Sequence, residues 1–188
     1  MVDTDTKSAL LDCAQDLIQR VGVNAMSYND LSEAVKIRKA SIHYHFPKKE
    51  DLIKALVERC HESHSGQYME IVKSDNDTLT KLQQFADIFE EGVKQNKICL
   101  IGMLSVEYAT LNPILQKTLE HSLCYTTKIF EHVFMQGIKE GVFSKTIDTH
   151  DAAFAYLSFL LGTQVTSRCV KEPKRFRLAI EAYLKILT

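Results

Sequence analysis

The stretch Lys36–Lys49, with the sequence KIRKASIHYHFPKK, decides how the first part of the chain is interpreted. It contains no Asp or Glu and five basic residues, which are Lys36, Arg38, Lys39, Lys48 and Lys49. Residues 1–35, by contrast, carry six acidic side chains and only two basic ones. Because the 188 residues together have a formal net charge of −1, the positive charge is a local feature of this stretch.

Helical patterns lie on both sides of the basic stretch. Apolar residues recur at helical spacing over residues 5–21. The spacing of Ser27 and Asp30 predicts a capping box at the start of a short helix that ends near Val35. A further helix is expected over Lys39–His45, after a link of three residues. Two short helices joined by such a link form a helix-turn-helix.

The rest of the chain also favours helices. Only 7 Gly and 3 Pro occur, and no strand-like alternation is evident. Asn112 and Pro113 are typical of a helix start, with a capping side chain followed by proline at the first helical position. We therefore expect an all-α protein of about nine helices, with an N-terminal three-helix helix-turn-helix domain over residues 1–47 and a second helical domain over residues 48–188.

Several classes of protein are disfavoured by what the sequence lacks. No apolar run approaches the roughly 20 residues that cross a bilayer, and the N-terminus has no signal-peptide core, so we expect a cytoplasmic protein. The five cysteines are scattered without a CxxC pair, which argues against a disulfide framework or a zinc ribbon. His61 and His64 share a helix face, but no further pair converges on them, and a zinc site needs about four ligands. We expect no metal, no cofactor and no enzymatic activity.

The stretch LLDCAQDLIQRVGVNAMSYNDLSEAVKIRKASIHYHFPKKEDLIKAL, residues 10–56, closely resembles the DNA-binding domain of the TetR family of repressors. Within it, the string SIHYHFPKKEDL is highly specific. The resemblance implies a transcriptional repressor that binds double-stranded operator DNA as a homodimer and is released when a small molecule binds. It also implies that the second domain binds the effector and carries the dimer interface.

The same resemblance suggests individual DNA contacts. In the recognition helix the expected contacts are Lys39, Ser41, His43, Tyr44 and His45, while Tyr28, Lys48 and Lys49 match positions that hold the DNA backbone. The family often has Gly, Ser and Gly where this chain has Lys36, Arg38 and Ala40. The usual serine cap is therefore lost, Arg38 adds a cation that can reach DNA, and Ala40 is small enough for close approach.

The last two predicted helices are candidates for the dimer interface. Residues 152–162 are apolar nearly all round, so one side can face the chain's own core and the other a partner. A second apolar stripe follows over residues 176–187. The competing interpretation is a helix fully buried in a monomer. The expected interface residues are Tyr156, Phe159, Leu160, Phe176, Ile180, Tyr183 and Leu184.

An effector pocket is expected among the helices between Thr78 and Arg168, although most of its candidate residues are also typical of plain core. They are Phe85, Phe89, Cys99, Met103, Glu107, Tyr108, His121 and Tyr125. Cys99 leaves open a redox- or electrophile-sensing repressor, against the competing interpretation of a simply buried thiol. A helical enzyme of unknown chemistry and an adaptor that binds only protein are competing functions, but both leave the basic stretch unexplained.

Overall fold

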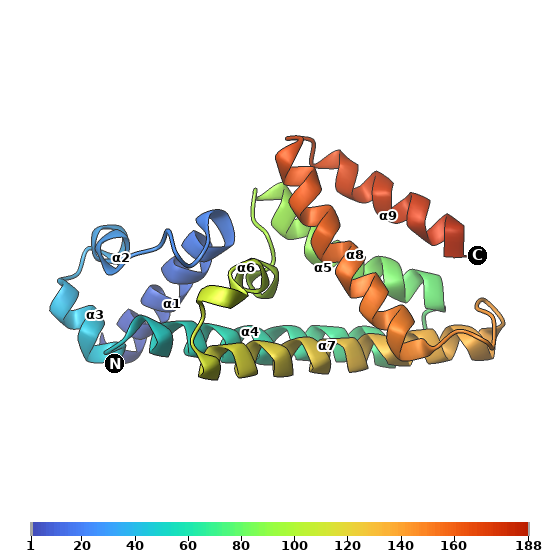
Figure 1. Cartoon of the computed structure of the whole chain (residues 1–188), viewed down its shortest axis with the longest axis horizontal. Coiled ribbons are helices and arrows are strands. Elements are labelled where there is room, and N and C mark those ends of the chain that lie inside the picture. The colour runs from blue at the N-terminus through green and yellow to red at the C-terminus, as the bar shows by residue number, and fades with distance from the viewer. Residues whose placement is uncertain (1, 188) are drawn as a thin grey trace. The chain divides into compact units, whose positions relative to one another are not determined.

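The computed structural model describes residues 2–187, with side chains from Asp5 onward. Over these residues the chain forms nine α-helices and one short 3-10 helix, without strands, which confirms the all-α prediction (Figure 1). The elements are α1 (Val2–Val21), α2 (Tyr28–Val35), α3 (Lys39–His45), α4 (Lys49–Lys73), α5 (Thr78–Lys94), α6 (Leu100–Val106), η1 (Tyr108–Thr110), α7 (Pro113–Glu140), α8 (Thr149–Cys169) and α9 (Lys174–Leu187).

The helices divide into two compact units that are not continuous in sequence. The N-terminal unit comprises the residues up to Glu62 together with Leu100–Ser122, and the C-terminal unit comprises Ser63–Cys99 and the residues from Leu123 onward. Helices α4 and α7 therefore each contribute residues to both units. The helix-turn-helix shares its unit with α6, η1 and the beginning of α7.

The N-terminal unit is built around the amphipathic faces of its helices. Leu10, Ala14 and Ile18 of α1 are fully buried, as are Leu31 of α2 and Ile42 of α3. Helix α2 contacts both α1 and α3. Its start is the predicted capping box, which is confirmed: the Ser27 hydroxyl accepts from the backbone N–H of Asp30, and the Asp30 carboxylate accepts from the backbone N–H of Ser27.

Helix α2 ends at Val35 and is followed by the C-cap residue Lys36, which has left-handed backbone angles of φ 58° and ψ 42°. This conformation costs a residue with a Cβ about 1–2 kcal/mol, and glycine largely avoids that cost. Because glycine also gains entropy in the unfolded chain, we expect Lys36→Gly to raise the free energy of unfolding by only about 0.5–1 kcal/mol. Denaturant titration measures the change, with Glu33→Gly inside α2 as a control that should lose about 1 kcal/mol. A loss of stability in Lys36→Gly would contradict this account of the turn.

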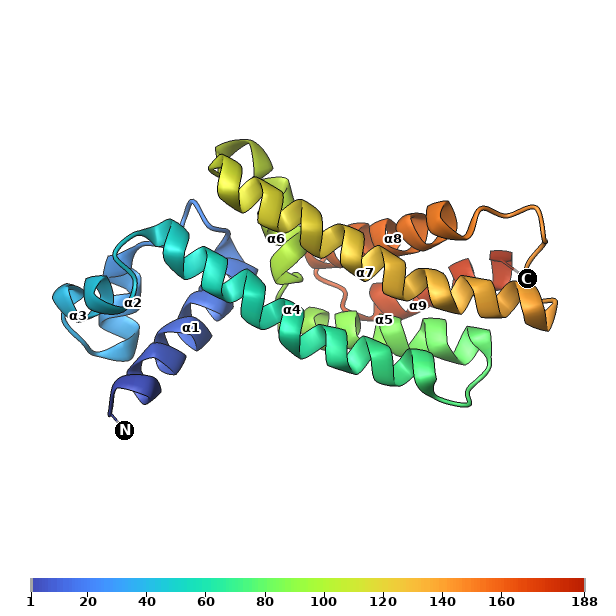
Figure 2. The same cartoon turned by 90° about the horizontal axis from the view of Figure 1, so that it is seen from below.

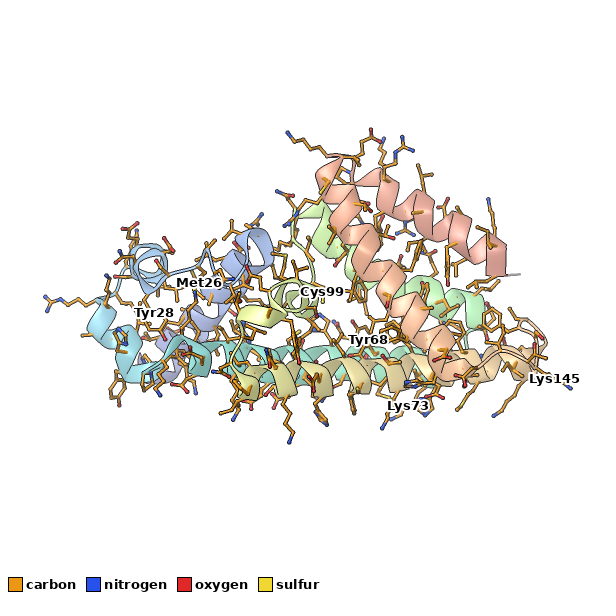
Figure 3. All side chains as sticks on the ribbon, in the orientation of Figure 1. Met26, Tyr28, Tyr68, Lys73, Cys99 and Lys145 are labelled. Atoms are coloured by element: carbon orange, nitrogen blue, oxygen red, sulfur yellow. The ribbon has the colours of Figure 1, made fainter. Side chains whose placement is uncertain are left out.

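The C-terminal unit is formed by α5, α8 and α9 with the later parts of α4 and α7. Helices α5, α8 and α9 contact one another, and both ribbon views show them side by side (Figures 1 and 2). Aromatic side chains fill the core of this unit, among them Tyr68 of α4 (Figure 3). The rings of Phe85 and Phe130 stack with 4.0 Å between their centroids, and Tyr68 lies edge-on to both. The buried Tyr156 hydroxyl donates to the carbonyl of Leu82, so this apolar core leaves that polar atom satisfied.

Candidate nucleic-acid interface

Helix α3 presents its polar and charged residues to solvent because Ile42 turns inward. Arg38, Lys39, His43 and Tyr44 are exposed, and the exposed fraction of Tyr44 reaches 75%. Among the other predicted contacts, Ala40 and Lys48 are exposed, whereas Ser41, His45, Tyr28 and Lys49 are partly buried. Arg38 is the N-cap residue of α3 and makes no side-chain capping bond, so its guanidinium is not used to cap the helix.

Tyr28 fixes α2 against the end of α3. Its hydroxyl donates to the carbonyl of Phe46 at 2.8 Å, and its ring lies edge-on to the His43 ring with 4.9 Å between centroids. Burial, with smaller contributions from Asp51 and Glu50, raises the pKa of Tyr28 to about 12. The phenol therefore stays protonated at neutral pH and remains a hydrogen-bond donor.

Lys48 and Lys49 are neighbours in sequence, but the structure uses them differently. The Lys48 side chain is exposed, and its backbone N–H donates to the Asp51 carboxylate at 3.0 Å. The Lys49 ammonium instead donates to the carbonyls of Val23 and Met26, each at 2.5 Å. Burial lowers the pKa of Lys49, while Glu107, Glu50 and Asp30 oppose that shift. Two of its three N–H donors thus have protein partners before any DNA is present.

Glu107 completes a clamp on the loop between α1 and α2. Its carboxylate accepts from the backbone N–H of Val23 at 2.7 Å and from that of Asn24 at 3.2 Å. We call Lys49 and Glu107 the loop clamp, because together they satisfy carbonyls and N–H groups of this one loop. Gly22 is required beside it: its φ is +92°, and a Cβ there would lie 2.6 Å from a Glu107 carboxylate oxygen.

The predicted effector residues are divided equally between the two compact units. Four of them belong to the C-terminal unit. Phe85 and Phe89 are buried in its core, Cys99 is partly buried against that core, and Tyr125 is exposed to solvent. The other four, which belong to the N-terminal unit, are Met103, Glu107, Tyr108 and His121. Glu107 forms part of the loop clamp, and the Tyr108 hydroxyl donates to Glu120.

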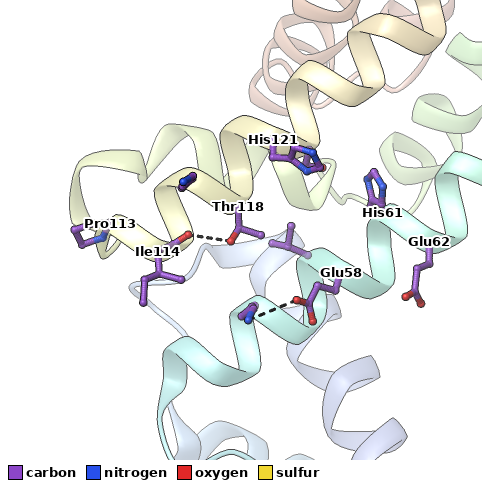
Figure 4. A pocket seen from close by; sticks show the side chains of 11 residues that line it. Glu58, His61, Glu62, Pro113, Ile114, Thr118 and His121 are labelled. Atoms are coloured by element: carbon purple, nitrogen blue, oxygen red, sulfur yellow. Dashed lines mark hydrogen bonds and ion pairs between the residues drawn. The ribbon is translucent and has the colours of Figure 1, made fainter.

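A groove of about 710 Å³ opens within the N-terminal unit between α4 and the start of α7 (Figure 4). Of the predicted effector residues only His121 lines it. Its other lining residues are Lys54, Val57, Glu58, His61, Glu62, Pro113, Ile114, Lys117, Thr118 and Ser122. Their spacing of three and four residues shows that each helix contributes one face, but the sequence does not say that these two faces meet.

The predicted dimer residues separate into two groups. Tyr156, Leu160, Phe176 and Ile180 are buried within their own unit, and burial raises the pKa of the Tyr156 hydroxyl. Phe159, Tyr183 and Leu184 keep part of their surface accessible. A side chain without accessible surface in one chain has none to offer a partner, so any interface on α8 and α9 rests on the accessible residues of these helices.

Metal sites and membrane spans are both missing from the part of the chain that the structure describes. No group of three or more His, Cys, Asp or Glu side chains is placed there to hold a metal ion. None of its helices combines the length and the apolar character that a membrane span requires.

Two family models match the sequence. The model "Bacterial regulatory proteins, tetR family" covers residues 10–56, and the model "Tetracyclin repressor-like, C-terminal domain" covers residues 78–183. The first includes the helix-turn-helix and its loop clamp residue Lys49. The second covers more than half of the chain.

Individual proteins that are similar to this chain are also transcriptional regulators. The chain is 26% identical over 160 residues to the HTH-type transcriptional repressor KstR2 of Rhodococcus jostii, which is 82% of this chain and 78% of that protein. It is 30% identical over 106 residues to the biofilm operon icaADBC HTH-type negative transcriptional regulator IcaR of Staphylococcus epidermidis, and that match spans 57% of the regulator's length. The crystal structure of a TetR-family transcriptional regulator from Agrobacterium tumefaciens superimposes with a TM-score of 0.92 at 26% identity, covering 99% of both chains.

Proposed function

Since the chain belongs to the TetR family of bacterial regulatory proteins, we propose that it is a cytoplasmic repressor that binds a palindromic operator as a homodimer and leaves it when a small molecule binds. The observation that carries DNA binding is the exposed surface of α3. It presents Arg38, Lys39, His43 and Tyr44, and no acidic residue lies between positions 36 and 49. Its relatives include KstR2, which is named a transcriptional repressor, and IcaR, which is named a negative transcriptional regulator.

Helix α3 is suited to the major groove of DNA by its size and its donors. A recognition helix reads base edges there, while basic side chains at its ends bind phosphates and set its register. In the proposed complex Arg38 and Lys48 hold phosphates on either side, and Lys39 and His43 reach base edges. Lys49 serves the interface indirectly, because its ammonium holds the loop that precedes α2.

Dimerisation is supported by the outward face of α8. Phe154, Ala155, Ser158 and Gly162 are exposed on it, and no charged residue occurs over residues 152–167. A solvent-facing helix of this length normally carries charges on its exposed side. We therefore place the dimer contact on this face, with Phe159 and Tyr183 at its border, where a two-fold axis would set the spacing of two half-sites.

Operator binding is tested with the full-length chain and labelled DNA from its own promoter region. We expect two chains per palindrome and an affinity that falls steeply as salt rises, because cations released from phosphates drive the binding. Fluorescence anisotropy measures the affinity, and sedimentation of the complex measures the stoichiometry. Scrambling one half-site should weaken binding sharply in the specific complex. Equal affinity for operator and scrambled DNA, or no response to salt, would overturn the proposal.

A further inference from the structure

We propose that the groove between α4 and α7 binds an amphipathic organic anion, and that this ligand is an effector of operator binding. The effect on operator binding rests on the proposed function, whereas the binding of the anion to the groove does not. The site lies wholly within the N-terminal unit, in the same compact unit as the helix-turn-helix. It is distinct from the aromatic core of the C-terminal unit, whose central Phe85 and Phe130 rings pack directly against each other.

The groove has the size and the apolar surface of a small-molecule site. Its volume of about 710 Å³ falls within the range of roughly 300–1,000 Å³ that ligand pockets occupy. Val57 forms part of the lining from α4, and Pro113 and Ile114 from the first turn of α7. Ile114 is 68% exposed, although it is a large apolar residue. An apolar ligand body laid across these residues would remove that surface from water.

Nitrogen donors from both helices face the groove and are suited to an anion. His61 from α4 and His121 from α7 point toward each other, with 6.4 Å between ring centroids (Figure 4). Lys117 lies four residues before His121, so it shares the same helix face. These three side chains are N–H donors that can converge on a carboxylate, sulfonate or phosphate.

The two carboxylates of the lining do not cancel this preference. Glu58 forms an ion pair with Lys54 along α4 at 3.8 Å. The Glu62 side chain points away from His121 (Figure 4). Once Lys54 and Glu58 are paired, Lys117 remains as the cation of the groove that shares a face with a histidine.

The groove touches the two segments that hold the helix-turn-helix in place. Helix α4 begins at Lys49, ahead of its groove residues, and Glu107 precedes Pro113 by six residues. A smaller hollow of about 360 Å³ shares Lys54 and Ile114 with the groove and extends to Lys48. A ligand that binds this groove more tightly when α4 and α7 lie farther apart would draw the two clamp residues, Lys49 and Glu107, away from each other. Such differential affinity is what shifts a protein between two conformers.

The probe for the test is 8-anilinonaphthalene-1-sulfonate, an amphipathic anion whose fluorescence rises in apolar sites. The full-length parent should bind it saturably, and the double variant Lys117→Gln/His121→Gln should bind at least about tenfold more weakly. The matched control is Lys128→Gln/His132→Gln, an exposed pair at the same spacing farther along α7, which should bind as the parent does. Near-UV circular dichroism verifies that each variant is folded, because the dye also binds molten states.

Two further measurements separate the parts of the proposal. A cationic amphipathic dye, rhodamine 6G, should not displace the anion, and displacement at equal concentration would overturn the charge assignment. Saturating anion should lower the operator affinity of the parent but not of the groove variant. Unchanged dye binding by the groove variant overturns the site even if operator binding is intact. A parent that binds dye at the groove but never binds operator would instead refute the proposed function.

Discussion

Replacing Glu107 with alanine is expected to weaken the loop between α1 and α2 by about 2 kcal/mol. The carboxylate accepts two backbone N–H bonds, from Val23 and Asn24, and a hydrogen bond to a charged group contributes about 1.5–3 kcal/mol where it is shielded from water. We take the lower part of that range because the Asn24 bond is exposed. Hydrogen exchange of the Val23 and Asn24 amides should therefore accelerate about 30-fold in Glu107→Ala.

The conservative variant distinguishes charge from shape. Glu107→Gln keeps one acceptor oxygen but loses the charge, so it should recover roughly half of the protection of these two amides. Glu33→Ala removes an exposed glutamate of α2 in the same unit and should leave their exchange unchanged. If the amides exchange at the parent's rate in Glu107→Ala, the clamp contributes nothing to holding this loop.

Features set by neighbouring residues could be predicted from the sequence. The capping box depends on Ser27 and Asp30, three positions apart, and its two bonds form within one helical turn. The start of α7 is similar, since the Asn112 side chain accepts from the backbone N–H of Leu115. The exposure of α3 also follows from a short pattern, in which Ile42 and Phe46 supply the buried side.

Features that depend on distant partners could not be predicted in this way. The N–H groups that Glu107 accepts from lie more than 80 residues away, and nothing near Glu107 in the sequence identifies them. The groove likewise requires one face of α4 to lie opposite one face of α7, which periodicity within either helix does not reveal. Helix α8 is apolar nearly all round, so its pattern could not say that Tyr156 faces its own core while Phe154 faces solvent.

The triple variant Arg38→Ala/Lys39→Ala/Lys48→Ala is expected to lose operator binding at physiological salt, by at least about 100-fold. These three cations are exposed. Only the backbone N–H of Lys48 donates to the Asp51 carboxylate, so the Lys48 side chain stays accessible. In a dimer the variant removes up to four phosphate contacts, from Arg38 and Lys48, and up to two base contacts, from Lys39. Because each phosphate contact contributes about 0.9 to the slope of log affinity against log salt, that slope should fall by about 3.6.

The control for this variant must change the charge by the same amount elsewhere. Lys128→Ala/Lys139→Ala/Lys145→Ala removes three exposed lysines of the C-terminal unit. It should keep the parent's salt slope if binding depends on local contacts, and it should lower the affinity as much as the first variant if only the net charge of the chain matters.

The single variant Lys49→Ala adds a further distinction. Because the Lys49 ammonium holds the carbonyls of Val23 and Met26, its loss should weaken operator binding through the position of α2. The salt slope should then change less than it does for Lys48→Ala, whose exposed side chain is free to reach a phosphate directly. Equal slopes for Lys48→Ala and Lys49→Ala would mean that the Lys49 ammonium leaves the loop to bind a phosphate.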